Sequence, residues 1–208
     1  MIKVEIWSDI NCPFCYIGKR HFEAALEKFP KKDLVQVEWK SFELDPTANP
    51  PKGADNYELL AKKYGKDRKW AVEMNQNLTQ MAAKAGLKFD TEHAVPANSF
   101  NAHRLIHLAK QNGLQDQMKE KLLSAKFVEC KDINDQKTLI EQALAVGLNE
   151  AEIKDVLESE KFSVEVREDE TKATQLGISG VPFFVFNQKY ALSGAQPVEA
   201  FTELLSQL

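Results

Sequence analysis

The chain has 208 residues, enough for one well-packed domain or for a domain with a large insertion. Its 27 basic and 31 acidic residues give a formal net charge of −4, whereas nucleic-acid-binding proteins usually carry a basic surface. No apolar run approaches the roughly 20 residues that cross a bilayer, and three cysteines do not form a disulfide scaffold. Because Met1 leads directly into strand-like residues, without a leader segment, we expect a cytoplasmic protein with no nucleic-acid or membrane partner.

The N-terminal part of the chain predicts a strand, a helix and a second strand. Residues 2–7, with the short, mainly apolar run Val-Glu-Ile-Trp at 4–7, predict a strand. Residues 13–29 follow a helical pattern, and residues 34–42 largely alternate between apolar and polar side chains. Two strands joined through a helix over so short a stretch indicate a βαβ unit. A loop rich in proline, glycine and asparagine follows at residues 45–53.

The central part of the chain predicts only helices, near residues 56–64, 67–85, 98–111, 115–128, 136–146 and 149–159. Glycines stand at plausible helix ends, and Asn98, Asp135 and Asn149 stand at plausible helix starts. We therefore expect a helical insertion domain at residues 53–160. It would divide one α/β domain into the segments 1–52 and 161–208.

The C-terminal part predicts a return to strands. After a helix near residues 162–176, the run at 183–186 is continuously apolar, as in a strand that is buried on both faces. A short strand at 189–192 and an amphipathic helix that begins with Pro197 complete the chain.

The most informative motif is a pair of cysteines at the junction between the first strand and the first helix. Cys12 falls at the N-cap, Pro13 at the first helical position and Cys15 at the third. A thiolate at the N-cap would lie against the first free N–H groups and the positive end of the helix dipole, which lowers a thiol pKa. We therefore expect Cys12 to be the exposed nucleophile and Cys15, within disulfide distance, to be the resolving thiol.

Two other interpretations of this pair remain open. A structural zinc needs four ligands, and Cys130 is the one further cysteine, so no metal site is predicted. Alternatively, both cysteines are inert core residues. A Cys-x-x-Cys motif beside a βαβ unit favours a redox site over either interpretation. The uncharged dipeptide between the cysteines, Pro13 and Phe14, would then tune the reduction potential.

Residues 8–18, with the sequence Ser-Asp-Ile-Asn-Cys-Pro-Phe-Cys-Tyr-Ile-Gly, resemble the active-site segment of DsbA-type thioredoxin-fold oxidoreductases. More narrowly, the chain resembles the FrnE-like branch, to which residues 98–105, 180–185 and 192–197 are also similar. The resemblance covers essentially the whole chain. It implies a thioredoxin-like α/β fold, β-α-β followed by α-β-β-α, with a large all-helical insertion and antiparallel last strands.

The resemblance also implies roles for residues outside the cysteine pair. A cis-proline, Pro182, would face Cys12, and the backbone of Val181 would pair with an extended substrate. Together with Phe14, these residues would bind the substrate. Because the strong oxidants of the family have a histidine between their cysteines and this chain has none, we expect a reduction potential between about −270 and about −120 mV.

The remaining candidates are histidines and the third cysteine. His103 and His107 share one helix face but lack further ligands for a metal. They are either ordinary helix residues or, by the resemblance, His103 lines the cleft above Cys12 and stabilises its thiolate or binds substrate. Cys130 matches no motif and is read as a spare, partly buried thiol, with a regulatory disulfide as the alternative.

These observations predict a thiol–disulfide oxidoreductase that acts on protein or small-molecule disulfides or thiols. It needs no bound cofactor, although glutathione is a possible redox partner, and the oligomeric state, monomer or homodimer, stays open. One alternative is a glutathione-dependent transferase or isomerase of the kappa-class or chromene-carboxylate isomerase type, which typically has serine at the position of Cys12. Another is a peptide-binding, chaperone-like module with idle cysteines.

Overall fold

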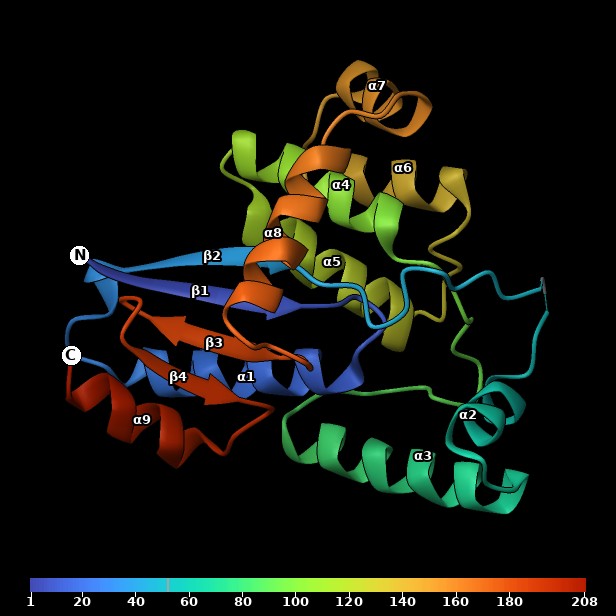
Figure 1. The fold of residues 1–208 in the computed structure, drawn as a ribbon, viewed down its shortest axis with the longest axis horizontal. Coiled ribbons are helices and arrows are strands. Elements are labelled where there is room, and N and C mark those ends of the chain that lie inside the picture. Colours follow the sequence, from blue (N-terminus) through green and yellow to red (C-terminus); the bar gives the residue numbers. More distant parts are fainter. Residues whose placement is uncertain (52) are drawn as a thin grey trace.

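The computed structural model describes residues 1–51 and 53–208, so that Lys52, the last residue of the first predicted domain segment, lies outside the described residues. Within them, the sheet has the strand order β2-β1-β3-β4 (Figure 1). Its strands are β1 (Ile2–Ser8), β2 (Val35–Ser41), β3 (Phe183–Phe186) and β4 (Tyr190–Ser193). β1 runs parallel to β2 and antiparallel to β3, and β4 runs antiparallel to β3. The two ends of the chain thus meet in one sheet.

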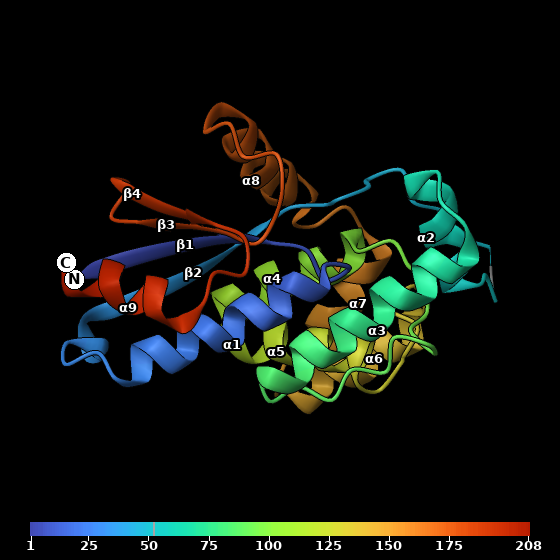
Figure 2. The same cartoon turned by 90° about the horizontal axis from the view of Figure 1, so that it is seen from below.

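Helices cover both faces of this sheet (Figure 2). The helices α1 (Pro13–Glu27) and α9 (Val198–Ser206) lie on one face, where the ring of Phe22 is 5.7 Å from the rings of both Phe184 and Phe201. The helix α8 (Ser163–Gln175) covers the other face, and the Trp7 indole N–H donates a hydrogen bond to the Asp169 carbonyl there. Burial on both faces explains why β3 is continuously apolar.

The remaining helices lie between β2 and α8 in the chain. They are α2 (Asn56–Tyr64), α3 (Arg68–Lys84), α4 (Phe100–Gln111), α5 (Gln115–Phe127), α6 (Gln136–Ala145) and α7 (Glu150–Glu158). α5 is joined to β2, because the Gln115 side chain exchanges hydrogen bonds with the backbone N–H and C=O of Trp39. α2 and α3 form a hairpin whose second helix runs beside α1 (Figures 1 and 2). The start of α1 therefore has helices above it as well as a sheet beside it.

The predicted α/β fold with many central helices is confirmed, and most predicted boundaries hold within two residues. Asp135 and Asn149 cap their helices with side-chain oxygens, as expected. The cap of α4 is Ser99 rather than Asn98, whose side chain accepts a hydrogen bond from the N–H of Phe100. The short 3-10 helix η1 (Lys32–Leu34) was not predicted. The division into two domains stays a prediction. Among the described helices, none combines the length and apolar character that crossing a bilayer requires.

Candidate active site

The cysteine pair sits where β1 ends and α1 begins. Cys12 is the N-cap residue of α1 and has extended backbone angles, and Pro13 is the first helical residue. The Cys15 N–H donates to the Cys12 carbonyl at 3.0 Å, and the Cys12 N–H donates to the Asp9 carbonyl at 3.2 Å. Both thiols are free. The predicted thiolate cap is wrong in one respect, because no N–H of the described first turn donates to the Cys12 sulfur.

The predicted exposure of Cys12 is also wrong. Only 3% of this residue is accessible to solvent, and Cys15 is fully buried. Cys12 is covered from one side by Val181, whose carbonyl accepts a hydrogen bond from the Cys12 thiol at 3.4 Å. From the other side it is covered by α2 and α3. The sulfur that was expected at the surface therefore lies at the bottom of a recess.

The two buried thiols hold their protons unequally. The hydrogen bond with Cys15 and the loss of solvent raise the pKa of the Cys12 thiol well above its ordinary value. Burial also raises the pKa of the Cys15 thiol, but the hydrogen bond with Cys12 and the positive charge of Lys119 outweigh it and lower that pKa. The two thiols share one proton, and the expected lowering of the Cys12 pKa is not found. The cation that offsets burial acts most strongly on Cys15.

Lys119 brings this charge from α5. Its ammonium group is fully buried, donates to the Ser8 carbonyl at 3.2 Å and lies 5.4 Å from the centre of the Trp39 ring. Burial lowers the pKa of Lys119 to about 8, against the attraction of Cys15 and Asp9. Buried lysines are rare unless a partner compensates for lost hydration, and here the partners are the redox pair and a neighbouring carboxylate.

His103 belongs to the buried layer and not to the cleft. The prediction that it lines the cleft above Cys12 is wrong, because His103 is 1% exposed and is not one of the described residues around the cavity. Its Nε2 lies 3.4 Å from Asp9 Oδ1. Burial lowers the pKa of His103, so its ring stays neutral near neutral pH. Burial raises the pKa of Asp9, but the adjacent His103 ring and the N–H of Leu44 outweigh it and lower that pKa.

The loop before β3 forms the second wall beside Cys12. The Val181–Pro182 peptide bond is cis, and the Val181 carbonyl is the group in contact with Cys12. The Pro182 ring packs against α1 at Gly18, where an added Cβ would lie 2.9 Å from Pro182 Cγ. The Pro182 carbonyl accepts a 2.7 Å hydrogen bond from the N–H of Gly194. The loop is thus fixed between α1 and the segment after β4, while its part in substrate binding stays a prediction.

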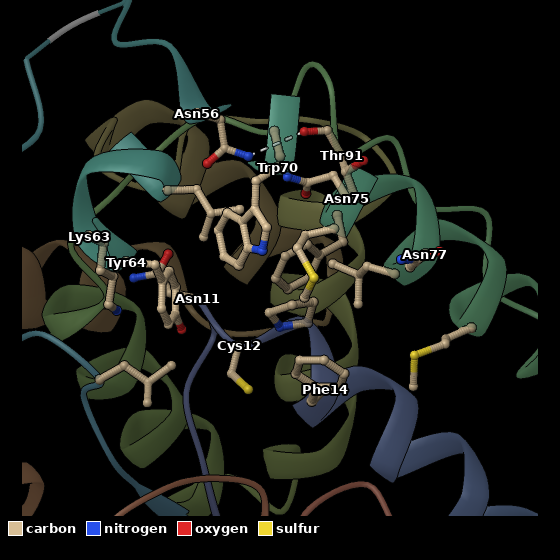
Figure 3. A pocket seen from close by; sticks show the side chains of 18 residues that line it. Asn11, Cys12, Phe14, Asn56, Lys63, Tyr64, Trp70, Asn75, Asn77 and Thr91 are labelled. Atoms are coloured by element: carbon tan, nitrogen blue, oxygen red, sulfur yellow. Dashed lines mark hydrogen bonds between the residues drawn. The ribbon is translucent and has the colours of Figure 1, made fainter. Parts of the chain in front are cut away.

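A cavity of about 370 Å³ opens above Cys12 (Figure 3). Cys12, Pro13 and Phe14 lie at its floor, and α2 and α3 form its walls. Figure 3 shows Trp70 and Tyr64 on those walls, above the Cys12 sulfur. Phe14 is 39% exposed, so its ring is available to a bound molecule. The arrangement leaves room for a disulfide-containing molecule to reach Cys12 from above.

Two other residues singled out from the sequence lie elsewhere. Cys130 is half-buried and donates through its sulfur to the Asp90 carbonyl at 3.3 Å. His107 lies 3.1 Å from Ser41 Oγ and 3.3 Å from Asp169 Oδ2, under α8. Across residues 1–51 and 53–208, no three histidine, cysteine or acidic side chains come together in a way that could hold a metal ion.

A family model described as a DSBA-like thioredoxin domain matches residues 3–206. The chain belongs to this DsbA-like family. The match confirms the family resemblance indicated by the residues around Cys12. Among solved structures, a probable DsbA oxidoreductase, SCO1869 of Streptomyces coelicolor, is 40% identical with a TM-score of 0.92, over 100% of this chain and 89% of that one. The uncharacterized protein YwbO of Bacillus subtilis is 28% identical over 207 residues, 99% of this chain and 96% of that protein.

More distant structures share the fold of this DsbA-like chain. The cytosolic disulfide reductase DsbM of Pseudomonas aeruginosa is 19% identical with a TM-score of 0.69, over 99% of this chain and 98% of that one. A chromene-carboxylate isomerase, HCCA isomerase, is 14% identical with a TM-score of 0.73, over 99% and 95% of the two chains.

Two parts of this DsbA-like site were not found from the sequence. Lys119 carried no signal, since lysine in a helix is ordinarily exposed. The cavity wall, in contrast, did carry a signal in the sequence. Trp70, Met74, Leu78 and Met81 recur at helical spacing on one face of α3, and all four line the cavity. An apolar stripe of this kind also fits a helix that packs against a core, so the spacing alone does not distinguish a cavity wall from a core-packing face.

Proposed function

We propose that this DsbA-family chain is a cytoplasmic thiol–disulfide oxidoreductase in which Cys12 attacks the substrate and Cys15 resolves the mixed disulfide. One observation supports this most. Cys12 lines the cavity, whereas its fully buried partner Cys15 lies within the influence of a buried cation, Lys119. Two inert core cysteines would need neither the opening above the first nor the charge near the second.

The reaction begins when a disulfide, R–S–S–R, enters above Cys12. The Cys12 thiol passes its proton to the Cys15 thiolate as its sulfur attacks, the R–S–S–R bond breaks, and one RS⁻ leaves. Cys15 then gives up its proton to the departing thiolate or to water and attacks Cys12 Sγ, which releases the second RS⁻. The protein has become a disulfide and the substrate two thiols, so two electrons have moved. The reverse sequence oxidises a dithiol.

The other site residues position the reacting groups. The Val181 carbonyl, 3.4 Å from Cys12 Sγ, is the backbone group beside the nucleophile, and Pro182 fixes it against α1. Pro13 and Phe14 lie at the cavity floor and set the surroundings of the thiols without adding charge. The partner is a compound with a thiol or disulfide. Glutathione is the reference thiol for the test, because a structure of the cytosolic reductase DsbM, 20% identical with a TM-score of 0.68, is known with GSH.

The test is a redox titration of the purified chain against glutathione buffers, with trapped thiols counted by mass spectrometry. We expect a Cys12–Cys15 disulfide with a potential between about −270 and about −120 mV. Cys15→Ser should accumulate a mixed disulfide on Cys12, and Cys12→Ser should lose exchange activity, whereas Cys130→Ser serves as the control. Failure to form the Cys12–Cys15 disulfide at any buffer potential would contradict the proposal.

A further inference from the structure

We infer that the cavity above Cys12 selects low-molecular-weight disulfides that carry an aromatic, uncharged group. This inference rests on the proposed function, because it names the substrate class of the same cysteine pair. It follows from the depth of Cys12 below the surface, from the side chains that line the cavity above it, and from the few charges among those side chains.

The depth of Cys12 favours a small substrate. Exchange requires the attacking and attacked sulfurs to approach to bonding distance, about 2.05 Å. Cys12 is only 3% exposed, with Val181 on one side and the helices α2 and α3 above it. A disulfide on the surface of a folded protein is surrounded by its own bulk and does not reach this floor, whereas a small molecule enters the cavity whole.

The walls favour an aromatic group. Phe14, Tyr64, Trp70 and Phe127 contribute rings from four separate elements, and Figure 3 shows the Trp70 indole above the Cys12 sulfur. Met74 and Met81 complete the wall with flexible thioether side chains, which make favourable contacts with ring edges and adapt to different shapes. Aromatic rings pack on one another with offset or edge-to-face geometry, so a planar substituent gains contacts that a flexible polar chain does not.

The charges argue against ionised substituents. Of the described residues that line the cavity, one is charged, Lys63, and it is exposed at the rim. The polar groups further in are neutral amides and the Thr91 hydroxyl, and the amide N–H groups are partly engaged. Asn56 donates to the Thr91 carbonyl at 3.2 Å, and Asn75 donates to the Ala71 carbonyl at 2.9 Å. Glutathione disulfide carries several carboxylates and ammonium groups, which would lose hydration here without finding counter-charges.

The test measures single turnovers of the reduced full-length protein, which is itself the reductant. Three disulfides are compared: benzyl hydroxyethyl disulfide, hydroxyethyl disulfide and glutathione disulfide. Each rate constant is divided by that of dithiothreitol with the same compound, which cancels intrinsic reactivity. We expect the normalised rate for the benzyl compound to exceed that for glutathione disulfide by at least about tenfold.

Variants on α3 identify the wall. Trp70→Ala should lower the normalised benzyl rate about tenfold. Met74→Lys, at a residue that is 41% exposed and therefore tolerant of a charge, should lower the benzyl rate and raise the glutathione disulfide rate. The control Lys69→Ala changes a side chain that is 84% exposed on the same helix and should leave all three rates unchanged.

Three results would each overturn the inference. The first is equal normalised rates for the three compounds, and the second is a benzyl rate that neither Trp70→Ala nor Met74→Lys alters. The third is faster oxidation by a denatured protein disulfide than by the benzyl compound. These results would leave the proposed function intact. If none of the disulfides oxidised the pair, the proposed function itself would fail.

Discussion

The contact between Gly18 and Pro182 yields a prediction with a definite size. In Gly18→Ala, the new Cβ would lie 2.9 Å from Pro182 Cγ and 3.4 Å from Ala195 Cα, whereas carbon atoms attract best at about 3.5–4.0 Å. Alanine gains about 1 kcal/mol over glycine inside a helix, and overpacking costs about 1–3 kcal/mol, so the free energy of unfolding should fall by about 0–2 kcal/mol.

The effect on the reaction should be larger than the effect on stability. To relieve the overlap, the Pro182 ring must move away from α1, and the adjacent Val181 carbonyl moves with it from its position 3.4 Å from Cys12 Sγ. A displacement of a few tenths of an ångström at the reacting atoms should lower the exchange rate constant by a factor on the order of ten.

Urea unfolding and single-turnover oxidation of the reduced protein measure the two quantities. Gly180→Ala is the matched control, since a Cβ added there meets no described atom within 4 Å and the residue precedes the same loop. It should leave both quantities near the wild-type values. A Gly18→Ala protein that is at least as stable as the wild type and reacts at the same rate would show that the contact does not position the loop.

Three further predictions concern buried titratable groups and the third cysteine. Burial lowers the pKa of Lys119 to about 8 from its ordinary value of 10.5. Between these two pH values the unfolded chain holds a proton that the folded chain has lost, so the free energy of unfolding rises with pH. Lys119→Met should remove this rise, which amounts to up to about 3 kcal/mol in the free energy of unfolding and is measured by urea unfolding of both proteins across this pH range. The variant should also raise the pKa of Cys15, which is followed by thiolate absorbance. If the unfolding free energies of the two proteins changed in parallel with pH, the assignment of a buried charge to Lys119 would be contradicted. Burial also lowers the pKa of His103, so the unfolded chain takes up a proton below pH 6.5 before the folded one does, and stability falls on acidification. His103→Gln should flatten that fall, and an unchanged acid limb would speak against a buried neutral imidazole. Cys130→Ser keeps a donor for the Asp90 carbonyl and should leave the turnover rates unchanged; a slower protein would instead give this thiol a part in the reaction.

The parts of the structure that sequence patterns predicted are those that local interactions determine. Pro13 can begin a helix because its missing N–H has no intrahelical partner there, and Asp135 and Asn149 cap helices with oxygens two or three residues from the N–H groups they accept from. The apolar run of β3 marks a strand with helices on both faces. These signals lie within a few residues of the features they specify.

The parts that were predicted wrongly depend on contacts between distant segments. Helical spacing placed His103 and His107 on one face but could not show that this face turns to Asp9 and Asp169 instead of the cavity. The N-cap position of Cys12 predicted an exposed thiolate. Its burial is decided by Val181, which is 169 positions away in the chain, and by the α2–α3 hairpin.

The helices between β2 and α8 contribute to the chemistry from two directions. From below, α5 inserts Lys119, whose charge favours a thiolate on Cys15. From above, α3 supplies Trp70 and the methionines that enclose the space over Cys12. The strand, the cysteine pair and the proline loop provide the exchange reaction, and these helices determine where the charge rests and which disulfide can enter. Changes at Lys119 should therefore alter the pKa values and the potential, whereas changes at Trp70 should alter the choice of substrate. The two effects should be separable by mutation because Lys119 is not among the described residues that line the cavity.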